Sequence, residues 1–176
     1  MSGFTFKQFK VEHDSCAMKV STDGILLGAW AYLKGANTLL DIGTGTGLLA
    51  LMCKQRQPAL SITAVEIDEA AYKQAQQNIA SSPWPNITVK HTTIQAFKQA
   101  APFDVVISNP PYFNRSLKGL SDARNTARHT DGLSFDELIH AYMRLSHEQS
   151  CFNVILPTTE AGLFIELAKQ NGLYLN

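Results

Sequence analysis

The 176-residue sequence has few cysteines, no surplus of charge of either sign and no long apolar run. Its three cysteines, Cys16, Cys53 and Cys151, lie far apart and form no Cys-x-x-Cys pair. An odd number of isolated cysteines does not fit a disulfide framework and predicts reduced, buried thiols in a cytoplasmic protein. The 15 basic and 15 acidic residues balance, so net charge indicates no nucleic-acid partner, and evidence for one must come from local features.

No segment predicts a membrane span or a secretion signal. The longest apolar stretch, Ile25 to Leu33, is too short to cross a bilayer. Lys7 and Lys10 are among the charged residues that interrupt the N-terminus, so it lacks the apolar core of a signal peptide. The five histidines show no metal-ligand spacing. We therefore expect a cytoplasmic protein that uses neither a membrane nor a metal.

Short apolar runs of strand character alternate with helical patterns. We expect strands at residues 38–42, 61–66, 87–89, 103–108 and 151–156, and helices at residues 48–55, 69–80, 134–147 and 159–171. Asp68 is the expected N-cap of the second helix, and Ser134 and Glu137 have the spacing of a capping box. Continuous apolar strands alternating with helices predict an α/β fold with a doubly wound, mostly parallel sheet covered on both faces.

The whole sequence, residues 1–176, is expected to form a single domain. Its hydrophobic content of 45% is enough for one substantial core, and it shows no repeat or linker. Leu173 to Asn176 have the pattern of the start of a sixth strand. Because a sheet ending there would leave an unpaired edge, we expect that the domain's last C-terminal strands are missing from this sequence.

The first motif with a chemical meaning is a glycine-rich stretch between a strand and a helix, Asp41-Ile42-Gly43-Thr44-Gly45-Thr46-Gly47. Glycines let the backbone turn sharply and let a ligand approach the main chain. The GxGxG spacing differs from the GxGxxG of dinucleotide-binding proteins, and the charge of Asp41 would repel a pyrophosphate. That charge would instead pair with a cationic ligand such as the ammonium or sulfonium end of S-adenosylmethionine. The candidate cofactor contacts are Asp41, Gly43, Thr44, Gly45 and Gly47.

Glu66 and Ile67, at the end of the second predicted strand, support the same cofactor site. Glu66 ends that strand 25 positions after Asp41, where an acidic side chain can accept both hydrogen bonds of a ribose diol. Ile67 would then pack on the adenine face of the cofactor. Asp68 is interpreted as the helix cap rather than as a ligand.

The tetrapeptide Asn109-Pro110-Pro111-Tyr112 follows the fourth predicted strand, at the sheet edge where ligands of open α/β folds bind. Each proline lacks an N–H group and restricts the residue before it to an extended conformation. The Asn109 side-chain oxygen and the Pro110 carbonyl then offer two fixed acceptors for an amine on a planar ring. Such acceptors return electron density to the nitrogen and aim it at an electrophilic methyl group. Tyr112 and Phe113 would offer flat faces for a base pulled out of its stack.

The combination of this tetrapeptide with the glycine-rich loop resembles the adenine-N6 and related amino-methyltransferases. Within them, the sequence is similar to a bacterial family that N6-methylates adenine 37 in the anticodon loop of valine tRNA. The stretches that carry this resemblance are residues 4–9, 16–20, 22–30, 128–130 and 133–135. It implies a class I methyltransferase with a Rossmann-like fold, S-adenosylmethionine as cofactor and tRNA as partner.

The same resemblance implies roles for residues outside the two motifs. Residues 1–37 would form a segment over the cofactor pocket of a core at residues 38–176, with Lys19 and Thr22 as cofactor contacts. Thr22 or Asp23 is alternatively only the cap of a helix. Many relatives carry an acidic residue just after the third strand. Thr93 stands at that position here, and its hydroxyl would have to bond the cofactor's adenine amine in place of the acid.

A loop with a local surplus of positive charge follows the tetrapeptide. Residues 115–131 contain four basic and two acidic residues. One interpretation is a loop that contacts phosphates and orders on RNA binding, and the other is ordinary solvated charge. The candidate substrate contacts are Phe113, Arg115, Lys118, Arg124 and Arg128.

We therefore expect a monomeric enzyme that moves a methyl group from S-adenosylmethionine to the N6 amine of an adenine in tRNA. Methyltransferases of a release-factor glutamine amide share the tetrapeptide but carry a sizeable helical domain before the glycine-rich loop, whereas only 37 residues precede the first core strand here. Guanine-amine rRNA methyltransferases usually have Phe where Tyr112 stands, and a DNA adenine methyltransferase would need a recognition domain. An inactive cofactor-binding module is the remaining alternative.

Overall fold

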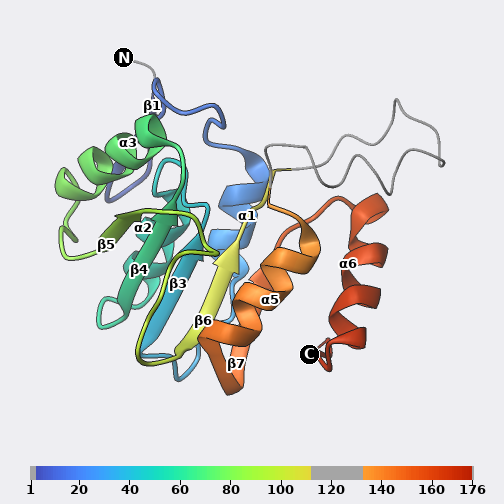
Figure 1. The fold of residues 1–176 in the computed structure, drawn as a ribbon. Coiled ribbons are helices and arrows are strands. Elements are labelled where there is room, and N and C mark those ends of the chain that lie inside the picture. Colours follow the sequence, from blue (N-terminus) through green and yellow to red (C-terminus); the bar gives the residue numbers. More distant parts are fainter. Residues whose placement is uncertain (1–2, 112–132, 176) are drawn as a thin grey trace.

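A computed structural model describes residues 3–111 and 133–175. Its main sheet has five strands in the order β5-β4-β3-β6-β7, and all neighbouring strands are parallel (Figure 1). The strands are β3 (Thr38–Ile42), β4 (Ser61–Glu66), β5 (Thr88–His91), β6 (Phe103–Ser108) and β7 (Ser146–Val154). The chain starts this sheet at its centre, winds out to β5 and returns to β6, so the expected doubly wound α/β fold is confirmed.

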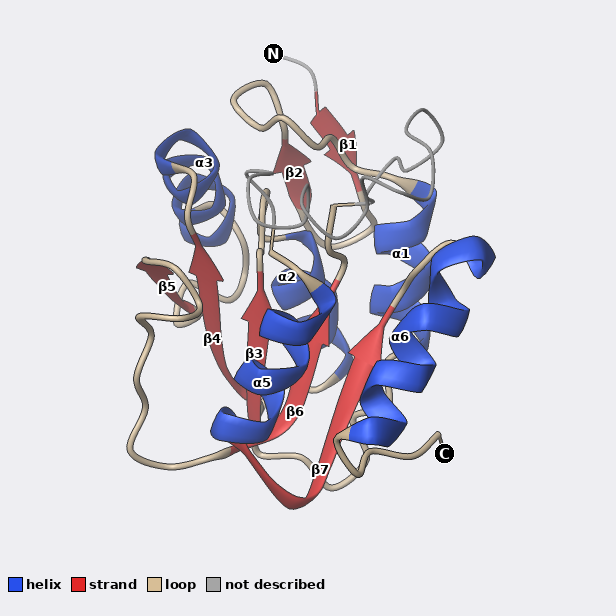
Figure 2. Ribbon diagram, turned by 45° about the vertical axis from the view of Figure 1, so that its right-hand side comes forward, coloured by secondary structure: helices blue, strands red, loops and turns tan. Residues whose placement is uncertain are grey.

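Helices cover both faces of the sheet (Figure 2). One face packs on α1 (Thr22–Trp30), α2 (Leu48–Arg56) and α3 (Glu69–Ala80), with Leu39 of β3 in the shared core. The other packs on α5 (Phe135–Leu145), with Leu40 in the core. Leu39 and Leu40 point to opposite faces because side chains alternate along a strand. The last helix, α6 (Thr158–Gln170), lies beside α5.

An antiparallel hairpin lies beyond the carboxyl ends of the sheet strands (Figure 2). It consists of β1 (Gly3–Thr5) and β2 (Lys10–Glu12). The buried side chain of Asn78 in α3 fastens it. Asn78 Oδ1 accepts from the Glu12 amide at 2.9 Å, and Asn78 Nδ2 donates to the carbonyls of Glu12 at 2.8 Å and Thr46 at 2.9 Å. One amide side chain thus joins the hairpin, α3 and the glycine-rich loop.

Most predicted elements of the core are confirmed, while the N-terminal segment differs from the expectation. Strands β3, β4 and β6 and helix α3 have the predicted bounds, and the Asp68 cap and the Ser134–Glu137 capping box are present. The hairpin and α1 were not predicted as elements. Neither Thr22 nor Asp23 caps α1, because Ser21 is its N-cap and accepts from the Gly24 amide at 3.2 Å.

The C-terminal part differs from the prediction in two places. Strand β7 begins at Ser146, five residues earlier than expected, with an irregular register opposite Phe103 and Val105. The predicted start of a sixth strand is wrong for the described residues 173–175, which form no strand. Gly172, at a φ of 79°, instead ends α6, and Leu173 packs against the core on the α5 face.

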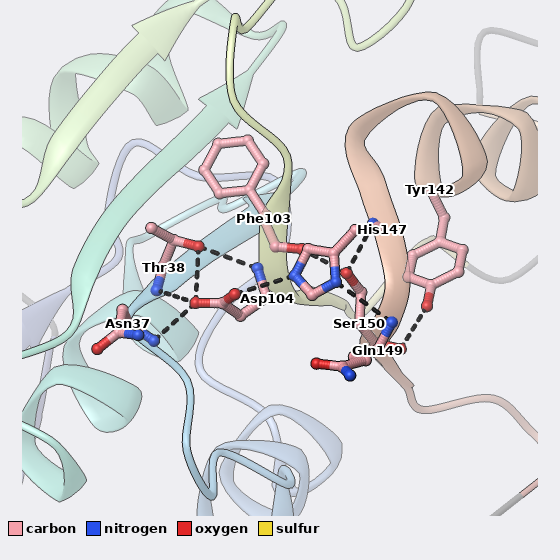
Figure 3. Close-up of polar contacts among 8 residues, drawn as sticks. All are labelled: Asn37, Thr38, Phe103, Asp104, Tyr142, His147, Gln149 and Ser150. Atoms are coloured by element: carbon pink, nitrogen blue, oxygen red, sulfur yellow. Dashed lines mark hydrogen bonds and ion pairs between the residues drawn. The ribbon is translucent and has the colours of Figure 1, made fainter.

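A polar network holds the amino ends of β3, β6 and β7 together, at the edge opposite the hairpin (Figure 3). Asp104 Oδ2 accepts from the amides of Asn37 at 2.7 Å and Thr38 at 2.9 Å, and Asp104 Oδ1 lies 3.0 Å from His147 Nε2. Ser150 Oγ donates to the Phe103 carbonyl at 2.7 Å. The hydrogen bond from His147, followed by that from the Asn37 amide, lowers the pKa of Asp104 to about 2. This network fixes the early start of β7.

Two further expectations concern the kind of protein. Among the helices of residues 3–111 and 133–175, none has the length and apolar character needed to cross a membrane. The three cysteines are free thiols, of which Cys16 and Cys53 are buried as expected, whereas Cys151 is only partly buried. Burial, as the largest cause, raises the pKa of Cys53 to about 12.

Candidate functional site

The two sequence motifs meet where the order of the strands reverses. The chain leaves β3 toward β4 on one side and comes back to β6 on the other, and β3 and β6 are parallel neighbours. Their carboxyl ends carry the glycine-rich loop and Asn109. Ser108, the last residue of β6, is buried, and its hydroxyl donates to the Ile42 carbonyl at 2.9 Å. This bond fixes Asn109 beside the start of the glycine-rich loop, in the crevice where open α/β sheets bind ligands.

The glycine-rich loop leaves its backbone open to a ligand. Gly43, Gly45 and Gly47 have φ values of 70°, 56° and 82°, which only glycine adopts at little cost. No heavy atom lies within 4 Å of where a Cβ of Gly43 or Gly45 would stand. The amides of Gly43 and Thr44 both donate to the Val65 carbonyl, at 2.9 and 3.1 Å. The loop is therefore tied to β4 while its outer surface remains free.

Asp41 is a fully buried carboxylate beneath this loop. Its Oδ2 accepts from the Thr44 hydroxyl at 2.6 Å, while its Oδ1 has no hydrogen-bond partner among the described residues. The Ala50 amide also lowers the pKa of Asp41, although it forms no hydrogen bond to Oδ1. Burial outweighs both contacts and raises this pKa from 3.8 to about 7. A buried acceptor without a partner fits a cationic ligand above the loop, because such a ligand would favour the ionised carboxylate.

Glu66 lies at the carboxyl end of β4 and is also buried. Its Oε2 accepts from the Gly45 amide at 2.8 Å, and its Oε1 accepts from the amides of Ile67 and Asp68, both at 2.9 Å. The carboxylate thus already binds three backbone donors rather than being held free for a ribose. Each carboxylate oxygen has further lone pairs, so ribose hydroxyls can still bond to it. Ile67, 67% exposed, stands beside it as an uncovered apolar side chain.

Thr93 follows β5 and is engaged locally. Its hydroxyl accepts from the Ala96 amide at 3.1 Å, and its carbonyl accepts from the Phe97 amide. The side chain therefore caps a turn, in the way that serine and threonine cap helices. The side chain of this segment that reaches the turn after β4 is that of His91, for which the sequence predicted no role beyond the lack of metal-ligand spacing.

A cavity of about 320 Å³ opens between the N-terminal segment and the tetrapeptide. It is lined by Met18, Lys19, Val20, Ser21, Asp23 and Asn109. The structure thus brings Lys19 and Asn109 together, whereas Thr22 is not in the lining. Cys16 is buried, and its pKa is raised to about 11, mainly by burial and further by the charges of Glu66 and Asp68. The segment that contains Cys16 and Lys19 thus approaches both the end of β4 and Asn109.

The rest of the predicted substrate site lies mostly outside the described residues. Asn109 is half-buried, Pro110 is buried and Pro111 is exposed. The predicted contacts beyond the described residues are Tyr112, Phe113, Arg115, Lys118, Arg124 and Arg128. Within residues 3–111 and 133–175, no group of three His, Cys, Asp or Glu side chains is placed to hold a metal ion.

Known proteins of similar sequence are methyltransferases. Residues 25–126 match the methyltransferase small domain family. The chain is 73% identical over 176 residues to the tRNA1(Val) (adenine(37)-N6)-methyltransferase of Pseudoalteromonas translucida. This match covers 100% of this chain and 76% of that relative. It is 51% identical over 174 residues to the protein of the same name from Phocaeicola vulgatus, covering 98% of this chain and 74% of that relative.

A solved structure of low sequence identity shares the fold. The crystal structure of a methyltransferase from Pyrococcus furiosus matches with a TM-score of 0.67 and 21% identity, covering 93% of this chain and 78% of that chain. At this identity the similarity concerns the architecture alone.

Proposed function

This chain belongs to the tRNA1(Val) (adenine(37)-N6)-methyltransferase family, and we propose that it transfers a methyl group from S-adenosylmethionine to the N6 amine of adenine 37 in tRNA1(Val). The observation that carries the proposal is the meeting of the glycine-rich loop and Asn109 at the strand-order reversal, where Asn109 also lines the cavity under the N-terminal segment. The isolated free thiols favour the cytoplasm, the compartment where such thiols persist.

The cofactor would be held by residues at the carboxyl ends of β3 and β4. The charge of Asp41, buried beneath the loop, would attract the cationic methionine end, and the open backbone of Gly43 and Gly45 would admit the chain of the ligand. Glu66 accepts from the ribose, and the exposed Ile67 packs on the adenine. S-adenosylmethionine, when bound there, supplies a methyl group made electrophilic by its sulfonium.

The substrate amine would be gripped by two acceptors. Asn109 Oδ1 and the Pro110 carbonyl each accept one N–H bond of the adenine N6 amine, which draws electron density back onto the nitrogen. The grip also orients the nitrogen toward the methyl group, so positioning supplies a large part of the rate enhancement. No general base is needed, because the proton leaves after the nitrogen has become cationic and water can take it.

Methyl transfer to unmodified tRNA1(Val) tests the proposal. The purified protein is incubated with labelled S-adenosylmethionine and the tRNA, and the RNA is digested to nucleosides. We expect label in N6-methyladenosine. The yield of label should fall at least about a hundredfold with Asn109→Ala and stay unchanged with Asn171→Ala, a control at the end of α6. Release factor offered as a competing substrate tests the glutamine-amide alternative, and label on that protein instead of the tRNA would contradict the proposal.

A further inference from the structure

Three turns at the carboxyl ends of β3, β4 and β5 are joined by hydrogen bonds around Glu66. The Gly45 amide donates to the Glu66 carboxylate at 2.8 Å, which joins the glycine-rich loop to the end of β4. On the other side, the Thr92 amide donates to the Glu66 carbonyl at 3.0 Å. His91, the last residue of β5, adds a side-chain bond, because its Nε2 lies 3.0 Å from the carbonyl oxygen of Ile67.

The chemistry of this contact fixes the role of the imidazole. A carbonyl oxygen can only accept, so the hydrogen must be on Nε2. The ring is also held in orientation, since it stacks on Tyr72 of α3 with a centroid distance of 5.1 Å and an interplanar angle of 20°. Nε2 carries a hydrogen in this neutral tautomer and in the cation alike. The bond to Ile67 therefore persists in either charge state of His91.

The carbonyl that His91 holds belongs to the same peptide unit as the amide of Asp68. That amide donates to Glu66 Oε1 at 2.9 Å, alongside the Ile67 amide at 2.9 Å. Because the peptide unit is planar, its C=O and N–H point in opposite directions and turn together. A bond to the carbonyl therefore also fixes the direction in which the Asp68 amide points. If the carbonyl were released, this peptide could rotate and Glu66 would lose one of its donors.

We propose that His91 is a positioning residue for the nucleoside half of the cofactor. It acts through the peptide between Ile67 and Asp68. The direction of this peptide determines the positions of the Glu66 carboxylate and of the exposed Ile67 side chain. The inference rests on the proposed function, in which these two residues take the ribose and the adenine. The end of β5 thus contributes to the cofactor site through His91, whereas the hydroxyl of Thr93 caps the turn that follows.

Two substitutions separate the hydrogen bond from the stacking. His91→Phe keeps an aromatic ring against Tyr72 and removes the donor. His91→Gln removes the ring and retains an N–H donor at about the reach of imidazole Nε2. His91 is exposed, so both variants should fold, and thermal unfolding without ligand checks this. The probes are S-adenosylhomocysteine and 5′-methylthioadenosine, which share the nucleoside half, with binding measured by calorimetry.

We expect His91→Phe to weaken the binding of both probes by about three- to tenfold, the range expected for one net hydrogen bond, and His91→Gln to stay within about twofold of the wild type. In methyl transfer, the KM for S-adenosylmethionine should rise with His91→Phe while kcat at saturation is unchanged. Wild-type affinity in His91→Phe, or an equal loss in both variants, would overturn the proposal. Failure of the wild-type protein to bind S-adenosylhomocysteine would instead count against the proposed function.

Discussion

Replacing Asp41 with Asn should change how the stability of the folded protein depends on pH. Burial raises the pKa of this carboxyl from 3.8 to about 7, against the lowering effects of the Thr44 hydroxyl and the Ala50 amide. The folded state thus binds this proton more tightly than the unfolded chain does. The free energy of unfolding is therefore largest below the unfolded pKa and falls as the pH rises toward about 7, above which the loss is complete.

The size of the effect follows from the difference between the two pKa values. At about 1.4 kcal/mol for each pH unit, the step from 3.8 to about 7 corresponds to at most about 4.5 kcal/mol. Of this, about 2–3 kcal/mol is lost between about pH 5 and about pH 8. Asn cannot ionise, but it places an amide N–H at the position of the partnerless Oδ1. That cost, about 1–3 kcal/mol, is the same at every pH.

Urea unfolding without cofactor, at several pH values between about 5 and 8, measures this difference. Relative to wild type, Asp41→Asn should gain about 2–3 kcal/mol of unfolding free energy across that range. The exposed Asp136 provides the control, since Asp136→Asn should give a curve parallel to wild type. A parallel curve for Asp41→Asn would mean that burial does not hold this carboxyl protonated near neutral pH.

Two further predictions concern packing and the opposite edge of the sheet. A Cβ at Gly28 would lie 2.6 Å from Met52 Sδ and 2.9 Å from Met52 Cβ, so Gly28→Val should lower the free energy of unfolding by about 1–3 kcal/mol in chemical denaturation. Gly162→Ala in α6, where no atom lies within 4 Å, should instead raise it by up to about 1 kcal/mol, and a loss there as large as at Gly28 would contradict the steric argument. Because the bond to His147 lowers the pKa of Asp104 to about 2, this carboxylate stabilises the protein above its unfolded pKa, and the gain is lost as the pH falls toward about 2. Asp104→Asn should therefore lower the free energy of unfolding near neutral pH but hardly at about pH 2, as measured by circular dichroism during denaturation. An equal loss at the two pH values would argue against this role of Asp104.

The core could be predicted from the sequence because each of its strands is a short continuous apolar run. Such a run identifies β3, β4 and β6 without knowledge of their neighbours, since both faces of a central parallel strand are buried. The first half of β7, Ser146 to Ser150, is polar, and its pairing depends on the bonds of Asp104 and Ser150, which no hydrophobic pattern contains. The three-residue strands of the hairpin depend in the same way on Asn78, 66 positions from its partner Glu12.

In the candidate site, too, the positions of residues could be predicted from the sequence, whereas their long-range contacts could not. Parallel strands bring their carboxyl ends to one edge, so Asp41, Glu66 and Asn109 could be placed together from their positions at or directly after the ends of strands. What the sequence could not show is how these residues are held. The contact of His91 with the Ile67 carbonyl spans 24 positions and depends on the direction of one peptide. The position of Thr93 indicated a cofactor contact, whereas in the structure its hydroxyl caps a turn.

A single-base change in the RNA shows whether the amine of adenine 37 is the methyl acceptor. Two transcripts of tRNA1(Val) that differ only in having adenine or guanine at position 37, the position named for the relatives, are incubated with the protein and labelled S-adenosylmethionine. We expect label to enter the adenine transcript as N6-methyladenosine and the guanine transcript to remain unlabelled. Equal labelling of both transcripts, or label in any other nucleoside, would contradict it.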